Sequence, residues 1–323
     1  MAVSQHNIMT NLVTLEEIYA ARDTIADKVH RTPLAYSTFF SNATGTNLYL
    51  KHELFQKTGS FKVRGVSNKM NALTEEEKRK GVITLSAGNH AQAVAWGAAQ
   101  YDIPSTIIMP QHSVVSKQIA TRDYGGEVIL SDGNLLEDCL RIQKERDLYL
   151  VHPFDDPKII AGHATCGVEI IEDVPNVDVV IVAVGGGGLI SGVAAAVKQL
   201  KPDTIVYGVE PEGADGMTRS LAAGKPVSLA VDTIADGLAA PFVGQHNLNH
   251  VQAFVDQVVT VNDDEIRAAL KLLWTRTKLF AEPAAAAPLA AMLNHKLDIP
   301  QGTTVVCIVC GGNVDLDNLD NLL

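Results

Sequence analysis

Cysteine is scarce in this sequence, and so is concentrated positive charge. The 323 residues include four cysteines, which are Cys139, Cys166, Cys307 and Cys310. Four are too few for a disulfide scaffold in a chain of this size, so we expect reduced thiols. The 26 basic and 37 acidic residues give a net charge of −11 and are scattered, without a basic block. The composition therefore argues against nucleic acid or a membrane surface as a partner.

The sequence also lacks a clear membrane-spanning segment. Its longest uncharged stretch, residues 179–197, is long enough to cross a bilayer, but four consecutive glycines lie in its middle. Glycine is costly inside a helix, so a strand, a loop and a helix in a buried core explain this stretch better. Residues 1–11 contain neither a basic head nor an apolar run, so we expect no secretory signal and a cytoplasmic location.

What the chain does contain is typical of a globular α/β protein. Hydrophobic residues make up 46% of it and charged residues 20%, and its length suggests about two domains. Thr14 and Glu17 form a capping-box pattern at the start of a first helix. Strands are expected at 82–85, 106–109, 127–130, 149–152, 178–184, 204–209 and 304–309, and helices at 91–101, 135–146, 189–200, 263–279 and 284–291. Because parallel strands need crossover helices, this alternation predicts two open, mostly parallel, twisted sheets flanked by helices.

Four consecutive glycines, residues 185–188, follow the strand expected at 178–184 and open a helix. Glycine N–H groups can converge on an anion beside the positive end of a helix, which favours a phosphate site over a simple tight turn. The loop matches neither the G-x-G-x-x-G dinucleotide pattern nor the Gly-Lys-Ser/Thr end of a P-loop. Glu210, at the end of the next strand, could imitate a ribose-binding acid, so a nicotinamide-binding protein stays an alternative.

Two further segments place polar groups beside glycine turns. Lys62 follows a glycine turn and the aromatic Phe61, and the segment Ser86-Ala-Gly-Asn-His follows an expected strand and opens a helix. Each is weak evidence alone, because most lysines are solvated and such a segment can be an ordinary helix cap.

The order and spacing of these segments carry more information than any one of them. They are Ser60-Phe-Lys-Val-Arg-Gly65, Ser86-Ala-Gly-Asn-His-Ala-Gln92, glycines 185–188 and Cys310-Gly-Gly-Asn313, joined by His30-Arg-Thr-Pro33, His152-Pro-Phe-Asp-Asp-Pro157, Thr233-Ile-Ala-Asp-Gly237 and Glu282-Pro283. The chain resembles the threonine/serine dehydratase and serine racemase family, within the second fold type of pyridoxal-phosphate enzymes. The resemblance implies a large cofactor-binding domain, residues 1–72 and 153–323, and a small substrate-loop domain, residues 73–152.

The resemblance also implies roles for individual residues. Lys62 would carry pyridoxal 5'-phosphate as a Schiff base, with Phe61 packed near the ring. The other cofactor contacts would be Asn89 at the ring hydroxyl, Gly185, Gly186, Gly187, Gly188 and Leu189 at the phosphate, Gly237 beside the ring and Cys310 at the ring nitrogen. The substrate carboxylate would bind at the loop of Ser86, Ala87, Asn89 and His90. A small β-hydroxy amino acid as substrate and assembly into a homo-oligomer are implied as well.

These residue types suit a β-elimination. Loss of water from a β-hydroxy amino acid needs an electron sink and a base at Cα, and Lys62 displaced from the cofactor is a neutral amine within reach of the Cα proton. The products would be a 2-oxo acid and ammonia. The thiol of Cys310 is a poor acid, so it should leave the ring nitrogen mostly unprotonated and favour elimination over transamination. A metal or redox pair of Cys307 and Cys310 is disfavoured, because residues three apart on a strand point to opposite faces.

Position 87 bears on which reaction is expected. Serine racemases of this family have a second serine there, on the opposite face of Cα, whereas Ala87 cannot carry a proton. We therefore expect a lyase for L-threonine, L-serine or both. A 3-hydroxyaspartate dehydratase or a serine racemase stays as an alternative within the family, and a non-catalytic or nicotinamide-binding α/β protein as the alternative outside it.

The sequence leaves a cation site open. By resemblance to the racemases, Glu210, the carbonyl of Ala214 and an acid two residues later would bind a divalent or monovalent cation, but the last position is Gly216. The competing interpretation is that Glu210 is a solvated acid. His246 and His250 have the spacing of helical metal ligands, but the asparagines between them indicate a loop with surface histidines.

Overall fold

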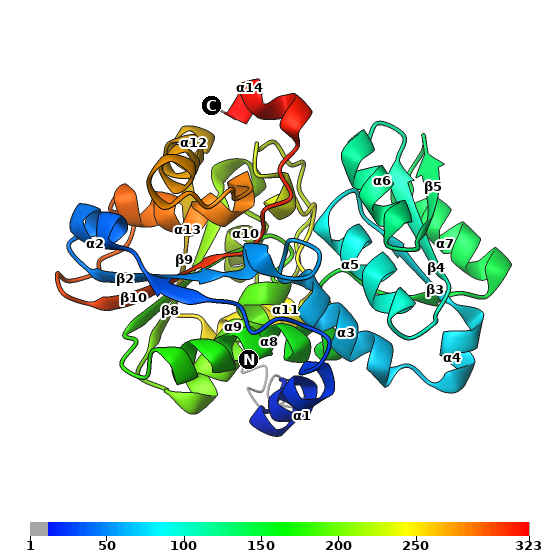
Figure 1. Cartoon of the computed structure of the whole chain (residues 1–323), viewed down its shortest axis with the longest axis horizontal. Helices are drawn as coiled ribbons and strands as arrows, with labels where there is room; N and C mark the ends of the chain where they lie inside the picture. Colours follow the sequence, from blue (N-terminus) through cyan, green and yellow to red (C-terminus); the bar gives the residue numbers. More distant parts are fainter. Residues whose placement is uncertain (1–11, 323) are drawn as a thin grey trace.

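A computed structural model describes residues 12–322, so the N-terminal segment 1–11, with its expectation of no secretory signal, lies outside the described part (Figure 1). The strands form two sheets. The larger sheet has the order β1 (Leu34–Tyr36), β2 (Asn47–His52), β10 (Thr304–Val309), β7 (Val179–Ala183), β8 (Ile205–Pro211) and β9 (Gln257–Val261). The smaller sheet has the order β5 (Glu127–Ser131), β4 (Ser105–Pro110), β3 (Val82–Leu85) and β6 (Tyr149–Leu150). Every neighbouring pair is parallel except β1 with β2, which confirms the predicted fold class.

Helices cover both faces of the larger sheet. Helix α13 (Pro283–Leu293) contacts strands β7 to β10, and α9 (Gly188–Leu200) contacts β7 and β8 from the opposite side and packs on α8 (Pro157–Asp173) (Figure 1). All five residues of β7 are buried, as expected for a parallel strand covered on both faces. The other helices of this part are α1 (Leu15–Ile25), α2 (Thr38–Thr44), α10 (Gly216–Ala223), α11 (Gln245–Phe254), α12 (Asp263–Leu272) and α14 (Leu319–Leu322).

The smaller sheet has its own helices. They are α4 (Glu75–Lys80), α5 (Asn89–Ala99), α6 (Val115–Asp123) and α7 (Leu135–Arg146). Helix α3 (Lys62–Ala72) lies between the two halves of the molecule and packs against α8 on one side and α5 on the other (Figure 1). The domain limits at residues 72/73 and 152/153 stay a prediction. Among the helices of residues 12–322, none combines the length and apolarity needed to cross a membrane.

Local sequence signals account for several helix boundaries. Thr14 and Glu17 form the expected capping box at the start of α1. The helix expected at 263–279 is α-helical only to Leu272 and continues as one π-helical segment, Leu273–Thr277.

The prediction of a loop around His246 and His250 is wrong, because α11 covers both residues. The Asp155 carboxylate accepts hydrogen bonds from the backbone N–H groups of Gln245 and His246, at 3.1 and 2.8 Å. Asp155, which lies 90 residues earlier in the chain, thus caps the first N–H groups of α11. This distant cap stabilises a helix even though the asparagines in it have low helix propensity.

Candidate active site

A cavity of about 590 Å³ lies at the carboxyl ends of β3, β7 and β10, where ligands of open α/β sheets usually bind. Its lining includes all of the residues expected to contact cofactor or substrate: Phe61, Lys62, Ser86, Ala87, Asn89, His90, Gly185, Gly186, Gly187, Gly188, Leu189, Gly237 and Cys310. The fold thus brings together segments that are far apart in the sequence. Glu210 and Ala214, expected at a cation site, are not among the lining residues.

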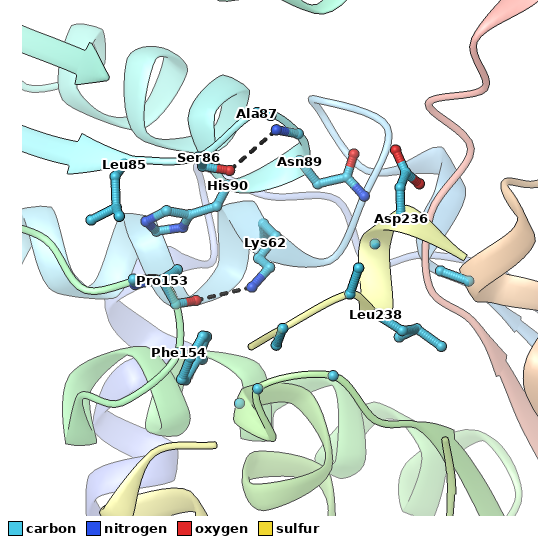
Figure 2. A pocket seen from close by; sticks show the side chains of 18 of the residues that line it. Lys62, Leu85, Ser86, Ala87, Asn89, His90, Pro153, Phe154, Asp236 and Leu238 are labelled. Atoms are coloured by element: carbon cyan, nitrogen blue, oxygen red, sulfur yellow. Dashed lines mark hydrogen bonds between the residues drawn. The ribbon is translucent and has the colours of Figure 1, made fainter. Parts of the chain in front are cut away.

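Lys62 is the first residue of α3, and its amine points into the cavity (Figure 2). The Nζ atom donates a hydrogen bond of 2.9 Å to the carbonyl oxygen of Pro153 and lies 5.2 Å from the centre of the Phe61 ring. Burial lowers the pKa of Lys62 to about 8, although the nearby Cys310 and Glu282 oppose the change. The amine is therefore far more nucleophilic near neutral pH than a solvated lysine.

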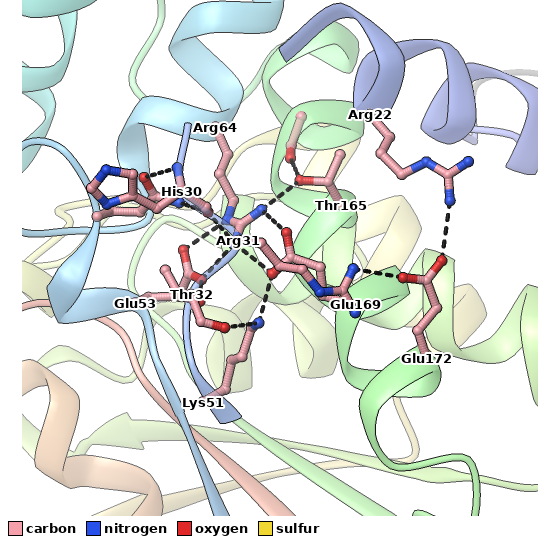
Figure 3. A network of polar contacts seen from close by, with 12 residues as sticks. Arg22, His30, Arg31, Thr32, Lys51, Glu53, Arg64, Thr165, Glu169 and Glu172 are labelled. Atoms are coloured by element: carbon pink, nitrogen blue, oxygen red, sulfur yellow. Dashed lines mark hydrogen bonds and ion pairs between the residues drawn. The ribbon is translucent and has the colours of Figure 1, made fainter. Parts of the chain in front are cut away.

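A buried charge network fixes the helix that carries Lys62 (Figure 3). Arg64, two residues after Lys62 on α3, is fully buried and donates to both oxygens of Glu53 at 2.8 Å and to those of Glu169 at 2.7 and 2.9 Å. Lys51 adds a bond of 2.6 Å to Glu169. These bidentate contacts tie the start of α3 to α8 and to the end of β2, so the backbone that positions Lys62 is held by paired charges.

The glycine loop forms a cradle that has no room for side chains. A Cβ atom on Gly186 would overlap the ring of Phe154, and one on Gly187 would come within 2.8 Å of Asn247. Gly187 also has a φ of +95°, which glycine adopts readily. Helix α9 starts at Gly188 and has no side-chain cap, so its first N–H groups are free to bind an anion.

The predicted substrate loop lies on the opposite wall of the cavity. The N–H of Gly88 donates to the Ser86 hydroxyl at 3.2 Å, which shapes the turn before α5 (Figure 2). Asn89 donates to Glu282 at 2.7 Å and accepts from Asn313 at 2.8 Å, which leaves its second amide hydrogen without a partner among residues 12–322. The Nε2 atom of the His90 ring lies 3.1 Å from the hydroxyl of Thr84, so this side chain already has a protein partner.

Sequence reasoning assigned no role to several residues of the cavity. Lys117 forms an ion pair of 2.5 Å with Asp236, which joins α6 of the smaller half to the 3-10 turn Asp236–Leu238 of the larger half. Burial raises the pKa of Glu282 to about 7, and the charge of Asp236 adds to this effect. Glu282 and Asp236 belong to quoted motifs, but nothing near Lys117 in the sequence marks it as a site residue.

Glu210 lies elsewhere and is fully buried, so its interpretation as a solvated acid is wrong. Its carboxylate accepts from the backbone N–H groups of Met217 and Thr218 at 2.7 and 2.9 Å and from the Thr218 hydroxyl at 2.8 Å. In residues 12–322 no three His, Cys, Asp or Glu side chains gather as a metal cluster, and the predicted cation stays untested. His250 is buried and accepts from the N–H of Val13 at 2.9 Å, so it is not the surface histidine expected.

Comparisons with known proteins agree with this geometry. Residues 25–311 match the family described as "Pyridoxal-phosphate dependent enzyme". L-threonine ammonia-lyase of Thermotoga maritima is 45% identical over 317 residues, which cover 97% of this chain and 78% of that protein. The catabolic L-threonine dehydratase of Staphylococcus aureus is 42% identical over 320 residues, covering 97% and 92%. The solved structure of maize serine racemase superposes with a TM-score of 0.91 at 40% identity, covering 96% of each chain.

The match spans most of the chain and includes the cavity lysine, the glycine cradle and the loop facing them. The resemblance drawn from the sequence motifs is thereby confirmed, and the chain belongs to the family of pyridoxal-phosphate-dependent enzymes of fold type II.

Proposed function

We propose that this protein is an ammonia-lyase that converts L-threonine, L-serine or both into a 2-oxo acid and ammonia. The observation that carries the proposal is one cavity in which a lysine amine of lowered pKa faces an anion cradle and a loop with alanine at position 87. The L-threonine ammonia-lyase and L-threonine dehydratase relatives, at 45% and 42% identity, support the same reaction.

The residues of the cavity fit pyridoxal phosphate. The cradle of glycines 185–188, which side chains would fill, and the first amides of α9 would hold the phosphate. Lys62 would bind the aldehyde carbon, the free N–H of Asn89 would reach the ring hydroxyl, and the Cys310 thiol would face the ring nitrogen. Burial raises the pKa of the Cys310 thiol, so this group stays neutral. When bound, the cofactor supplies the sink for the electron pair left at Cα.

Lys62 would act as the base of the elimination. Its Nζ takes the Cα proton, the freed electron pair forms the Cα–Cβ double bond, and the β-hydroxyl leaves as water with the proton that Lys62 has taken up. Hydrolysis of the resulting enamine by one water then gives the 2-oxo acid and ammonia. The amine can do this near neutral pH because burial lowers its pKa to about 8, so a sizeable fraction is unprotonated.

The wall of the cavity favours a substrate with a neutral side chain. The described lining residues include two lysines and no arginine; Lys62 has the role of base, and Lys117 is paired with Asp236 at 2.5 Å. Leu135 and Leu136 add apolar surface beside them. A second substrate carboxylate would find no unpaired cation here, which supports threonine and serine over 3-hydroxyaspartate.

A coupled assay for 2-oxo acids with L-threonine, L-serine and 3-hydroxyaspartate tests the proposal. Threonine or serine should be turned over fastest, and Lys62→Ala should lose nearly all activity. Borohydride reduction followed by peptide mapping should find the pyridoxyl group on Lys62, and an adduct on another lysine would reject the assignment. Asp236→Asn should raise the relative turnover of 3-hydroxyaspartate by releasing the charge of Lys117.

We further propose that the protein acts in the cytoplasm as a homo-oligomer. The four cysteines are all free and buried, which suits a reducing compartment. Tyr36, Phe55 and Phe280 expose 45–50% of their surface and would be available for contact with a second copy of the chain. Sedimentation velocity tests the assembly, and a fully active monomer would reject it.

A further inference from the structure

The Asn247 side chain joins two parts of the cavity wall. It is fully buried on α11, and its Nδ2 atom donates to the carbonyl oxygen of Gly186 at 2.9 Å and to that of Phe154 at 3.2 Å. Two carbonyl acceptors define which way the amide points, because only the NH2 end can donate to both. The Oδ1 atom is left buried without a hydrogen-bond partner. An unpartnered buried acceptor is costly, so this orientation is maintained by the two bonds at the other end.

The Phe154 carbonyl, which accepts the longer of these two hydrogen bonds, belongs to the segment that also binds the Lys62 amine. Pro153, whose carbonyl accepts from Lys62 at 2.9 Å, directly precedes Phe154 (Figure 2). The same segment is attached to α11 a second time, through the Asp155 carboxylate and the first N–H groups of that helix. The ring of Phe154 lies under Gly186, where it leaves no space for a Cβ atom. Helix α11 thus fixes the position of the glycine cradle relative to the Pro153 carbonyl, which accepts the hydrogen bond from the lysine amine.

We propose that Asn247 is a positioning residue that fixes the distance between the phosphate cradle and the docking point of the free Lys62 amine at Pro153. Its two N–H groups hold the carbonyls of Gly186 and Phe154 in one register, so the amine released from the cofactor stays aligned with the Cα proton. This inference rests on the proposed role of Lys62 as the base. Asn247 touches neither the reacting atoms nor the amine and acts through the backbone of both segments.

The test compares Asn247→Leu, which is nearly isosteric but donates no hydrogen bond, with Asn249→Leu, the same change two residues along α11. Asn247→Ala repeats the comparison with a smaller side chain in case leucine impairs folding. Binding of pyridoxal 5'-phosphate and of pyridoxal is measured by absorbance titration. We expect both Asn247 variants to bind the phosphorylated cofactor about tenfold more weakly and pyridoxal almost unchanged, since one net hydrogen bond alters an affinity by roughly two- to tenfold. Asn249→Leu should bind both as the unmodified protein does.

The second readout is the primary deuterium isotope effect on turnover of threonine labelled at Cα. A misplaced amine slows proton removal, so the isotope effect on kcat should rise in the Asn247 variants and not in Asn249→Leu. Unchanged cofactor affinity and isotope effect in both Asn247 variants would overturn the inference, and so would equal losses in the Asn249 control. Failure of the proposed function gives a different result. The unmodified protein would then produce no 2-oxo acid, while the Asn247 variants would still bind pyridoxal 5'-phosphate more weakly and pyridoxal almost unchanged.

Discussion

The lowered pKa of Lys62 predicts how attachment of the cofactor depends on pH. Burial brings this pKa from 10.5 down to about 8. At pH 7 an amine with a pKa of 8 is about 10% neutral, whereas one with a pKa of 10.5 is only about 0.03% neutral, a ratio of about 300. Only the neutral amine attacks an aldehyde, so the rate of Schiff-base formation should rise about tenfold per pH unit below pH 8 and level off above it.

The assay measures Schiff-base absorbance after pyridoxal phosphate is mixed with protein freed of cofactor, from pH 6 to pH 10. Dividing each rate by that of N-acetyl-lysine under the same conditions removes the ionisations of the cofactor itself. Lys62→Ala serves as the control for surface lysines and should show only the slow reaction. A normalised rate that stays constant over the whole range would mean that Lys62 titrates like a solvated lysine, and the argument from burial would be refuted.

Three substitutions extend the test to the cradle, the substrate loop and the buried charges. Gly186→Val should weaken pyridoxal-phosphate binding by more than about tenfold because the side chain meets the Phe154 ring, and adding Phe154→Ala should restore part of it; equal affinity in titrations would contradict the cradle. Ala87→Ser should raise the fraction of D-serine among the products of L-serine in chiral chromatography, whereas D-serine made by the unmodified protein as fast as pyruvate would show that another group donates the second proton. Glu169→Gln should lower the free energy of unfolding by about 3 kcal/mol or more in urea titrations, because it leaves buried cations underpaired. Glu172→Gln on the same helix is the exposed control and should cost less than about 1 kcal/mol, so equal losses would remove the special role of the network.

Much of the fold was predictable because its signals are local. The strands at 82–85 and 304–309 and the helix at 135–146 occur where the sequence predicts them. Runs of β-branched and apolar residues, glycine loops and capping residues act within about ten positions of one another. The family was predictable for a related reason, since Lys62, the glycine loop and the loop at Ser86 are short motifs whose order and spacing resemble those of the family, and the comparisons confirm the family.

Predictions from the sequence were wrong, or missed a residue, where the structure depends on contacts that no local sequence signal reveals. Helix α11 was missed because its cap, Asp155, lies 90 residues earlier in the chain. The sequence left Glu210 open between a cation ligand and a solvated acid, and it did not reveal that this carboxylate is buried and accepts hydrogen bonds from the start of α10. Lys117 and Asp236, which meet across the cavity, are 119 residues apart; Asp236 belongs to one of the quoted motifs, but Lys117 looks like an ordinary surface charge in the sequence. The contacts of Asp155 and Lys117 join segments 90 and 119 residues apart, which no window of the sequence contains.

The sequence by itself therefore determined many of the secondary-structure units, the presence of two mostly parallel sheets and the residues expected to meet cofactor and substrate. Only the tertiary structure decided what surrounds the lysine: the burial that lowers its pKa, the Pro153 carbonyl that accepts a hydrogen bond from its amine, and the Asn247 amide that ties this segment to the glycine cradle. The physical reason is that desolvation and hydrogen-bond geometry are properties of packed groups from several distant segments. They arise when α3, α9 and α11 come together around one cavity, and no single segment encodes them.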